Sequence, residues 1–142
     1  MGNIRTTWRR VLLFCVGPLI VTAIVCSQIS TPFSGGSITG WLISPIAQNL
    51  LFAGYFYRHL SEYFPGLVHD RLPISKAILI IAGFFALWHV PNIELGIGSF
   101  IWFQLLYTFV VACLMGLVRQ WSGSLVYGTL AHMAGNAIAH YS

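Results

Sequence analysis

The chain has 142 residues, of which 57% are hydrophobic and only 7% are charged, and its formal net charge at pH 7 is +4. Its mean hydropathy is +0.79, whereas a soluble domain carries about 25% charged residues. This composition predicts an integral membrane protein and excludes a nucleic-acid-binding surface, which needs cations clustered on an exposed face.

The length limits how often the chain can cross a bilayer. Each helical crossing takes about 20 apolar residues, so the chain has room for about five crossings and little outside them. We therefore expect one transmembrane domain over residues 1–142. The cysteines Cys15, Cys26 and Cys113 lie inside apolar runs, which favours small buried side chains over a disulfide or a metal site.

Apolar runs between polar or proline-containing breakers predict five transmembrane helices. They cover residues 11–29, 41–57, 77–90, 99–118 and 124–140. The first run follows Arg9 and Arg10, as in a signal peptide, but it is long and has no clear cleavage site, which favours a span. A polar segment at 58–76 precedes the third span, and residues 119–123 form the turn before the last.

All seven basic residues fall on one side of this predicted arrangement. They are Arg5, Arg9, Arg10, Arg58, Arg71, Lys76 and Arg119. Loops on the cytoplasmic side of a membrane carry an excess of lysine and arginine. We therefore expect the N terminus in the cytoplasm and the C terminus outside.

Five polar side chains fall inside the predicted spans, where each costs free energy unless it finds a partner. They are Gln48 and Asn49 in the second span, His89 at the end of the third, and His132 and Asn136 in the fifth. A spacing of four places His132 and Asn136 on one helical face. At a rise of about 1.5 Å per residue, all five lie in the outer half of the membrane. They can therefore form one polar pocket open to the outside.

A simpler interpretation is that these side chains only hold helices together, at about 1 kcal/mol each. The fifth span also has a face of small residues that allows close packing, which consists of Gly128, Ala131, Gly135 and Ala139. Composition and spacing alone leave both interpretations open.

Three segments resemble the motifs of the CPBP family, the CAAX protease and bacteriocin-processing (Abi) proteins. Residues 44–55 read Ser-Pro-Ile-Ala-Gln-Asn-Leu-Leu-Phe-Ala-Gly-Tyr, similar to the first motif, Pro-x-x-Glu-Glu-Leu-x-Phe-Arg-Gly. Residues 85–89 resemble the second, Phe-x-x-x-His. Residues 122–125 and 132–136 resemble the third, with a Gly-Ser-Leu turn and His-x-x-x-Asn. Order and spacing agree from about residue 41 to residue 140.

The resemblance implies an all-α membrane fold, a CAAX-protease-like helical bundle with an intramembrane polar pocket, in a bacterial or archaeal plasma membrane. In that family a glutamate activates water for peptide-bond hydrolysis, while histidines and an asparagine orient the water and stabilise the oxyanion. The matching positions are Gln48 for the catalytic glutamate, Asn49 beside it, His89, His132 and Asn136, with Phe85 in support.

The chain departs from the first motif at three positions. Gln48 and Asn49 replace both glutamates, and Ala53 replaces the arginine. An amide is not basic near neutral pH, although it can hydrogen-bond to water. Losing a general base costs about 10²- to 10⁴-fold in rate.

Few other groups can supply the missing chemistry. Glu62 and Asp70 lie in the predicted cytoplasmic segment, so Glu94, five residues after His89, is the one possible substitute acid. Two histidines with neutral amides do not make a catalytic zinc site, which needs three protein ligands. We expect no metal and no cofactor.

Two functions fit these residues. The first is an intramembrane peptidase, normal or catalytically impaired, that processes or binds a membrane-anchored peptide; the intact His89, His132 and Asn136 favour it. The second is a pseudoprotease that binds a peptide without turnover, as a chaperone or immunity-type protein does; Gln48 and Asn49 favour it. Both need the lipid bilayer and a membrane-anchored or hydrophobic peptide or protein as partners.

Overall fold

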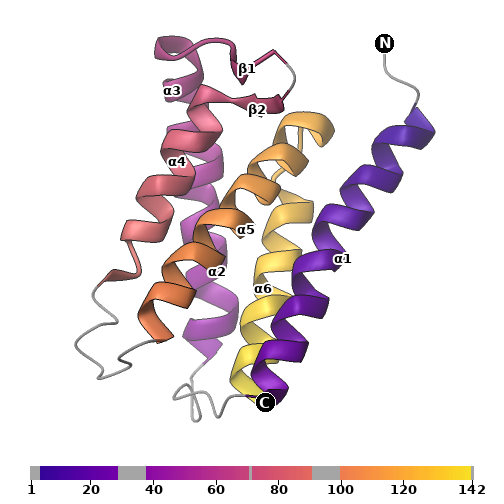
Figure 1. The fold of residues 1–142 in the computed structure, drawn as a ribbon, viewed down its shortest axis with the longest axis vertical. Coiled ribbons are helices and arrows are strands. Elements are labelled where there is room, and N and C mark those ends of the chain that lie inside the picture. Colours follow the sequence, from indigo (N-terminus) through magenta and orange to yellow (C-terminus); the bar gives the residue numbers. More distant parts are fainter. Residues whose placement is uncertain (1–3, 29–37, 71, 91–99, 142) are drawn as a thin grey trace. The chain divides into compact units, whose positions relative to one another are not determined.

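The computed structural model describes residues 4–28, 38–70, 72–90 and 100–141, which are mostly helical (Figure 1). In chain order the elements are α1 (Ile4–Gln28), η1 (Thr39–Ile43), α2 (Ser44–Asn49), η2 (Leu50–Phe56), α3 (Tyr57–Tyr63), β1 (Leu67–His69), β2 (Leu72–Ser75), α4 (Lys76–Leu87), α5 (Phe100–Ser122) and α6 (Val126–Tyr141), where η marks a π-helix. Helices occupy each of the predicted spans. The prediction of a mostly helical fold is confirmed, and the structure also contains one small β-hairpin that was not predicted.

Two helices among the described residues are long and apolar enough to cross a bilayer. They are Trp8–Ser27 within α1 and Trp102–Ser122 within α5. The apolar helix α4 has 12 residues, about 18 Å at 1.5 Å per residue, which is less than the ~30 Å of a hydrocarbon core. The expected number of five crossings stays a prediction.

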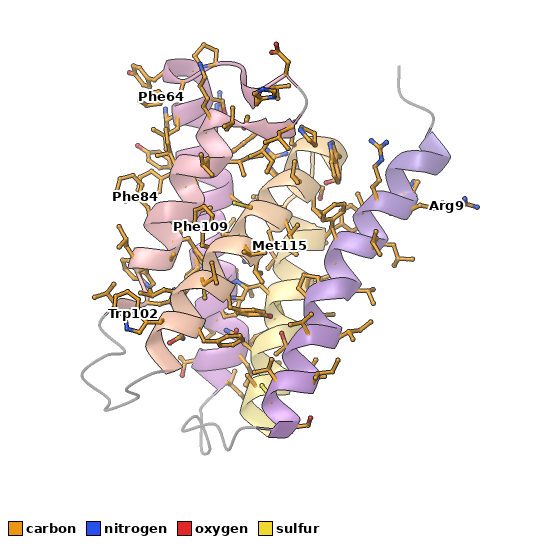
Figure 2. The ribbon with its side chains drawn as sticks, viewed as in Figure 1. Arg9, Phe64, Phe84, Trp102, Phe109 and Met115 are labelled. Carbon is orange, nitrogen blue, oxygen red and sulfur yellow. The ribbon has the colours of Figure 1, made fainter. Side chains whose placement is uncertain are left out.

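Several helices expose large apolar side chains. On α1, Leu13 is 67% exposed and Ile24 is 59% exposed. Figure 2 shows Phe84 on α4 and Trp102 on α5, which are also exposed, extending away from their helices. Water-soluble monomers rarely expose extended apolar surface, so these faces fit contact with lipid tails.

The helices form two compact units. The first contains Met1–Leu51 and Val118–Ser142, and the second contains Phe52–Leu117. The chain leaves the first unit inside η2 and returns to it inside α5. The expected single domain over residues 1–142 stays a prediction.

In the first unit α1 packs along α6, as the indigo and yellow helices of Figure 1 show. Gly135 lies on this contact, since a Cβ at this position would lie 3.7 Å from Cδ2 of Leu19, an ordinary van der Waals distance. The rings of Trp8 and Tyr127 meet edge to face, with their centroids 5.4 Å apart. At Gly135, the predicted small-residue face of the fifth span is thus a packing face.

The helix α5 is longer than predicted. We expected a span that ends at residue 118 and a turn over 119–123, but α5 continues to Ser122. Gly123 ends the helix with a φ of 69°, a left-handed conformation in which glycine has no Cβ penalty. Its N–H donates to the carbonyl of Arg119 at 3.0 Å. Most of the predicted turn is therefore helical.

The polar segment at 58–76 contains structure that was not predicted. It holds α3 and an antiparallel hairpin in which Leu67 pairs with Ser75. The hydroxyl of Ser75 then accepts a hydrogen bond from the N–H of Ile78 at 3.3 Å and caps α4. The hairpin therefore leads directly into the helix that carries the second motif.

An aromatic cluster forms a core in the second unit. Phe52, Ile81 and Phe85 are buried together, and Tyr57, Leu60 and Ala112 pack against them. The rings of Phe52 and Phe85 meet edge to face with their centroids 5.3 Å apart, a geometry worth about 0.5–1.5 kcal/mol beyond burial. This contact joins residues of the first and second motifs within one unit.

Candidate functional site

The two motif amides lie at the end of α2, between two π-helical segments. In η1 the N–H of Ser44 donates to the carbonyl of Thr39, five residues back. Pro45 follows and has no N–H, so the ordinary i to i−4 hydrogen bond cannot form at this residue. π-Helical turns are rare inside helices and frequently occur at functional sites.

Asn49 links α2 to α6 through its side-chain amide. Its Nδ2 donates to the carbonyl of Pro45 at 2.8 Å and lies 2.9 Å from Nδ1 of His132. Asn49 is only 8% exposed, and the two hydrogens of its nitrogen suffice for both partners. The structure thus brings together two of the predicted site residues, Asn49 and His132.

Gln48 leaves one polar atom without a partner. Its Nε2 donates to Oγ of Ser44 at 2.9 Å, one turn earlier. Its Oε1 is buried and accepts no hydrogen bond from the described residues. An unsatisfied buried acceptor costs about 1–3 kcal/mol. This oxygen, at the motif position of the catalytic glutamate, can accept a hydrogen bond from a ligand or from water.

Asn136 makes a second contact between α6 and the helical segment that carries the first motif. Its Nδ2 donates to the carbonyl of Gly40 in η1 at 3.2 Å. His132 and Asn136 therefore contact the same segment, as residues four apart on one helical face can. Residue numbers rise from 132 to 136 on α6 while they fall from 49 to 40 on its partner, so the two segments run in opposite directions.

His89 lies in the second unit, just after the end of α4. Its Nδ1 lies 2.9 Å from the carbonyl oxygen of Phe85, and the two rings meet edge to face with centroids 5.1 Å apart. The Phe-x-x-x-His spacing thus holds the imidazole against the preceding helical turn. The expected convergence of His89 with Asn49 and His132 stays a prediction.

Neither α2 nor α6, which carry the hydrogen-bonded pair, contains a carboxylate. Ala53, at the motif arginine, is half-buried in η2. Glu94, the expected substitute acid, lies outside the described residues. Glu62 and Asp70 are exposed in the second unit, on α3 and between the hairpin strands.

Metal ligands do not cluster in the part of the chain that the structure describes. Across those ranges no group of three or more His, Cys, Asp or Glu side chains could hold an ion. Cys15, Cys26 and Cys113 are free thiols on α1 and α5.

Three partners of the site amides were not predicted from the sequence: the hydroxyl of Ser44 and the carbonyls of Pro45 and Gly40. Ser44 could have been found, because it precedes Gln48 by four residues and shares its helical face. The carbonyls of Pro45 and Gly40 could not, because every residue has a carbonyl and only the fold decides which of them meets a side chain.

A family model described as "Type II CAAX prenyl endopeptidase Rce1-like" matches residues 30–138 of the chain. This range contains all the motif segments identified in the sequence. Among curated proteins, none matches the chain. No solved structure matches it either.

Proposed function

The chain belongs to the Rce1-like family of type II CAAX prenyl endopeptidases, and on this basis we propose that it binds a membrane-anchored peptide with hydrolysis absent or strongly impaired. The family match confirms the resemblance found in the motifs. It also confirms that the chain is a membrane protein of the CAAX-protease-like class. The proposed site consists of Gln48, Asn49, His132 and Asn136, with His89 as its member from the second motif.

The Asn49–His132 hydrogen bond is the observation that carries the proposal. The family motif has a glutamate here, which can accept a proton or a hydrogen bond. The amide of Asn49 donates instead, and Gln48 beside it is not basic either. Water bound by these amides is oriented but not deprotonated, which costs about 10²- to 10⁴-fold in rate.

A peptide group suits the polar atoms of this site. The buried Oε1 of Gln48 lacks a donor among the described residues, and a peptide N–H is such a donor. Hydrogen bonds are electrostatically stronger in a buried, low-dielectric environment than in water. A ligand with its own lipid anchor would approach from the bilayer along the exposed apolar faces of the helices.

A working peptidase is the second candidate. Family membership favours it, and His89, His132 and Asn136 keep the remaining motif groups. Such an enzyme needs an acid from outside the first motif, and Glu94 is the candidate.

Mass spectrometry of a prenylated CAAX-type peptide, incubated with protein in lipid nanodiscs, separates the two candidates. Four versions are compared: the native protein, His89→Ala, Glu94→Gln, and the triple variant Gln48→Glu/Asn49→Glu/Ala53→Arg. Binding of the labelled peptide to each version is followed by fluorescence anisotropy. The controls are the same peptide without its prenyl group and the variant Glu62→Gln, which changes an exposed acid on α3.

We expect the native protein to bind the peptide and leave it intact, and the triple variant to cleave it because the carboxylates return. Cleavage by the native protein that is lost in His89→Ala or Glu94→Gln would replace this proposal with the peptidase. A native protein that does not bind the prenylated peptide would also contradict it.

A further inference from the structure

The two ring nitrogens of a neutral histidine have different roles, because one carries a hydrogen and donates while the other accepts. The partner of one nitrogen therefore decides the role of the other. His132 and His89 each make a hydrogen bond through Nδ1, but to partners of opposite kind.

The partner of His132 is a donor. The amide atom of Asn49 that faces His132 also lies 2.8 Å from the carbonyl oxygen of Pro45. A carbonyl only accepts, so this atom is the NH₂ nitrogen and not the amide oxygen. Its second hydrogen is available to Nδ1 of His132 at 2.9 Å. Nδ1 therefore accepts, and the hydrogen of the neutral ring is on Nε2.

The partner of His89 is an acceptor. Nδ1 of His89 lies 2.9 Å from the carbonyl oxygen of Phe85, so Nδ1 carries the hydrogen. In the neutral ring Nε2 then keeps its lone pair. The two motif histidines thus have opposite groups at Nε2, a donor in His132 and an acceptor in His89.

We propose that Asn49 is a positioning residue that holds His132 as the neutral tautomer with its hydrogen on Nε2. A carboxylate at position 49 would accept from an Nδ1–H and favour the opposite state. The asparagine therefore does more than remove a base, because it also changes what His132 can do. With its hydrogen on Nε2, the ring has a donor at that nitrogen, and it cannot take up a proton at Nδ1 while the Asn49 contact persists.

Nitrogen-15 NMR of histidine-labelled protein in nanodiscs reports the tautomer, since protonated and unprotonated ring nitrogens differ widely in chemical shift. Spectra are recorded at alkaline pH, where imidazoles are neutral, for the native protein, Asn49→Asp and Asn49→Leu. The variants His132→Gln and His89→Gln assign the two rings. His89 serves as the internal control, because its backbone partner is the same in every Asn49 variant.

We expect native His132 to be protonated at Nε2 and native His89 at Nδ1. Asn49→Asp should move the hydrogen of His132 to Nδ1, and Asn49→Leu should give a mixture of tautomers, while His89 keeps its pattern. Native His132 protonated at Nδ1 would overturn the proposal, as would a His132 pattern that is the same in all three proteins. The NMR samples contain no peptide, so the spectra test the tautomer of His132 independently of peptide binding. A native protein that fails to bind the prenylated peptide would contradict the proposed function but not the tautomer assignment.

Discussion

Nδ2 of Asn49 lies 2.9 Å from Nδ1 of His132, although 83 positions separate the two residues in the chain. The contact joins the first motif to the third within one compact unit. Because the amide also donates to the carbonyl of Pro45, one buried side chain connects two helices.

Removing this amide should destabilise the protein. We expect Asn49→Leu to cost roughly 1–3 kcal/mol, because the Pro45 carbonyl and the His132 ring lose their donor. A double-mutant cycle with His132→Leu should give a coupling energy of about 0.6 kcal/mol and at most about 1.7 kcal/mol, the mean and the maximum for such contacts in a membrane protein. Unfolding in detergent measures both quantities.

Thr108→Val provides the control for this cycle, since the Thr108 hydroxyl donates to the carbonyl of Gln104 in its own helix. Its effect should add to that of Asn49→Leu. A coupling near zero between Asn49 and His132 would contradict the pairing.

Gln48→Met should have two opposite effects. It removes a buried acceptor without a partner among the described residues, which should stabilise the protein, but it also removes the hydrogen bond from Nε2 to Ser44. The free energy of unfolding should therefore rise only slightly, by about 1 kcal/mol or less. Affinity for the prenylated peptide should fall about 5- to 10-fold, because a hydrogen bond is lost. Anisotropy titration and detergent unfolding measure the two effects, with Gln104→Met on α5 as the matched control. Unchanged affinity would argue against Gln48 as a ligand contact.

Gly116→Ala tests the packing of α5 against α4. The added Cβ would lie 2.7 Å from Cγ2 of Ile78, a residue that is 1% exposed and cannot easily move. We expect a loss of about 1–3 kcal/mol from overpacking. The loss should shrink in an Ile78→Ala background, which removes the clashing atoms.

Gly83→Ala on α4 is the matched control, because a Cβ there meets nothing within 4 Å. Alanine is the better helix former by about 0.5–1 kcal/mol, so this variant should be neutral or more stable. Equal melting temperatures for the two alanine variants would show that Gly116 is not a close-packing position.

Ser75→Ala should remove the cap of α4. The N–H of Ile78 would lose its acceptor, at a cost of about 1 kcal/mol. Ser75→Asp should keep most of the stability, since its carboxylate accepts the same hydrogen bond and favours a helix N-terminus. Thermal unfolding of the three proteins distinguishes a capping role from a packing role, in which both substitutions would destabilise equally.

The positions of the helices could be predicted from the hydrophobic runs, because a long apolar run in a membrane has few alternatives to a helix. The expected span at 124–140 corresponds to α6, Val126–Tyr141. A need for partners in apolar surroundings also predicted that Asn49 and His132 lie close together, and the two side chains are within hydrogen-bond distance in the structure. Their role in a functional site stays a prediction.

Other features leave little trace in sequence. A π-helix differs from an α-helix in the carbonyl to which each N–H donates its hydrogen bond. Because the difference is not one of composition, η1 and η2 cannot be distinguished from their α-helical neighbours in the sequence. The strands β1 and β2 have 3 and 4 residues, too few to show alternation. Arg119 was placed in a turn because it is charged, yet it lies half-buried on α5, since long basic side chains can bury their stems.

Chemical labelling at the hairpin can determine on which side of the membrane the hairpin lies. Asp70 is exposed between the two strands, whereas Cys26 and Cys113 are buried and Cys15 is half-buried. A thiol introduced by Asp70→Cys would therefore be far more reachable from water than the native cysteines. A membrane-impermeant maleimide added to sealed vesicles would modify it from one face only, and the face that reacts would report which leaflet the hairpin lies beside.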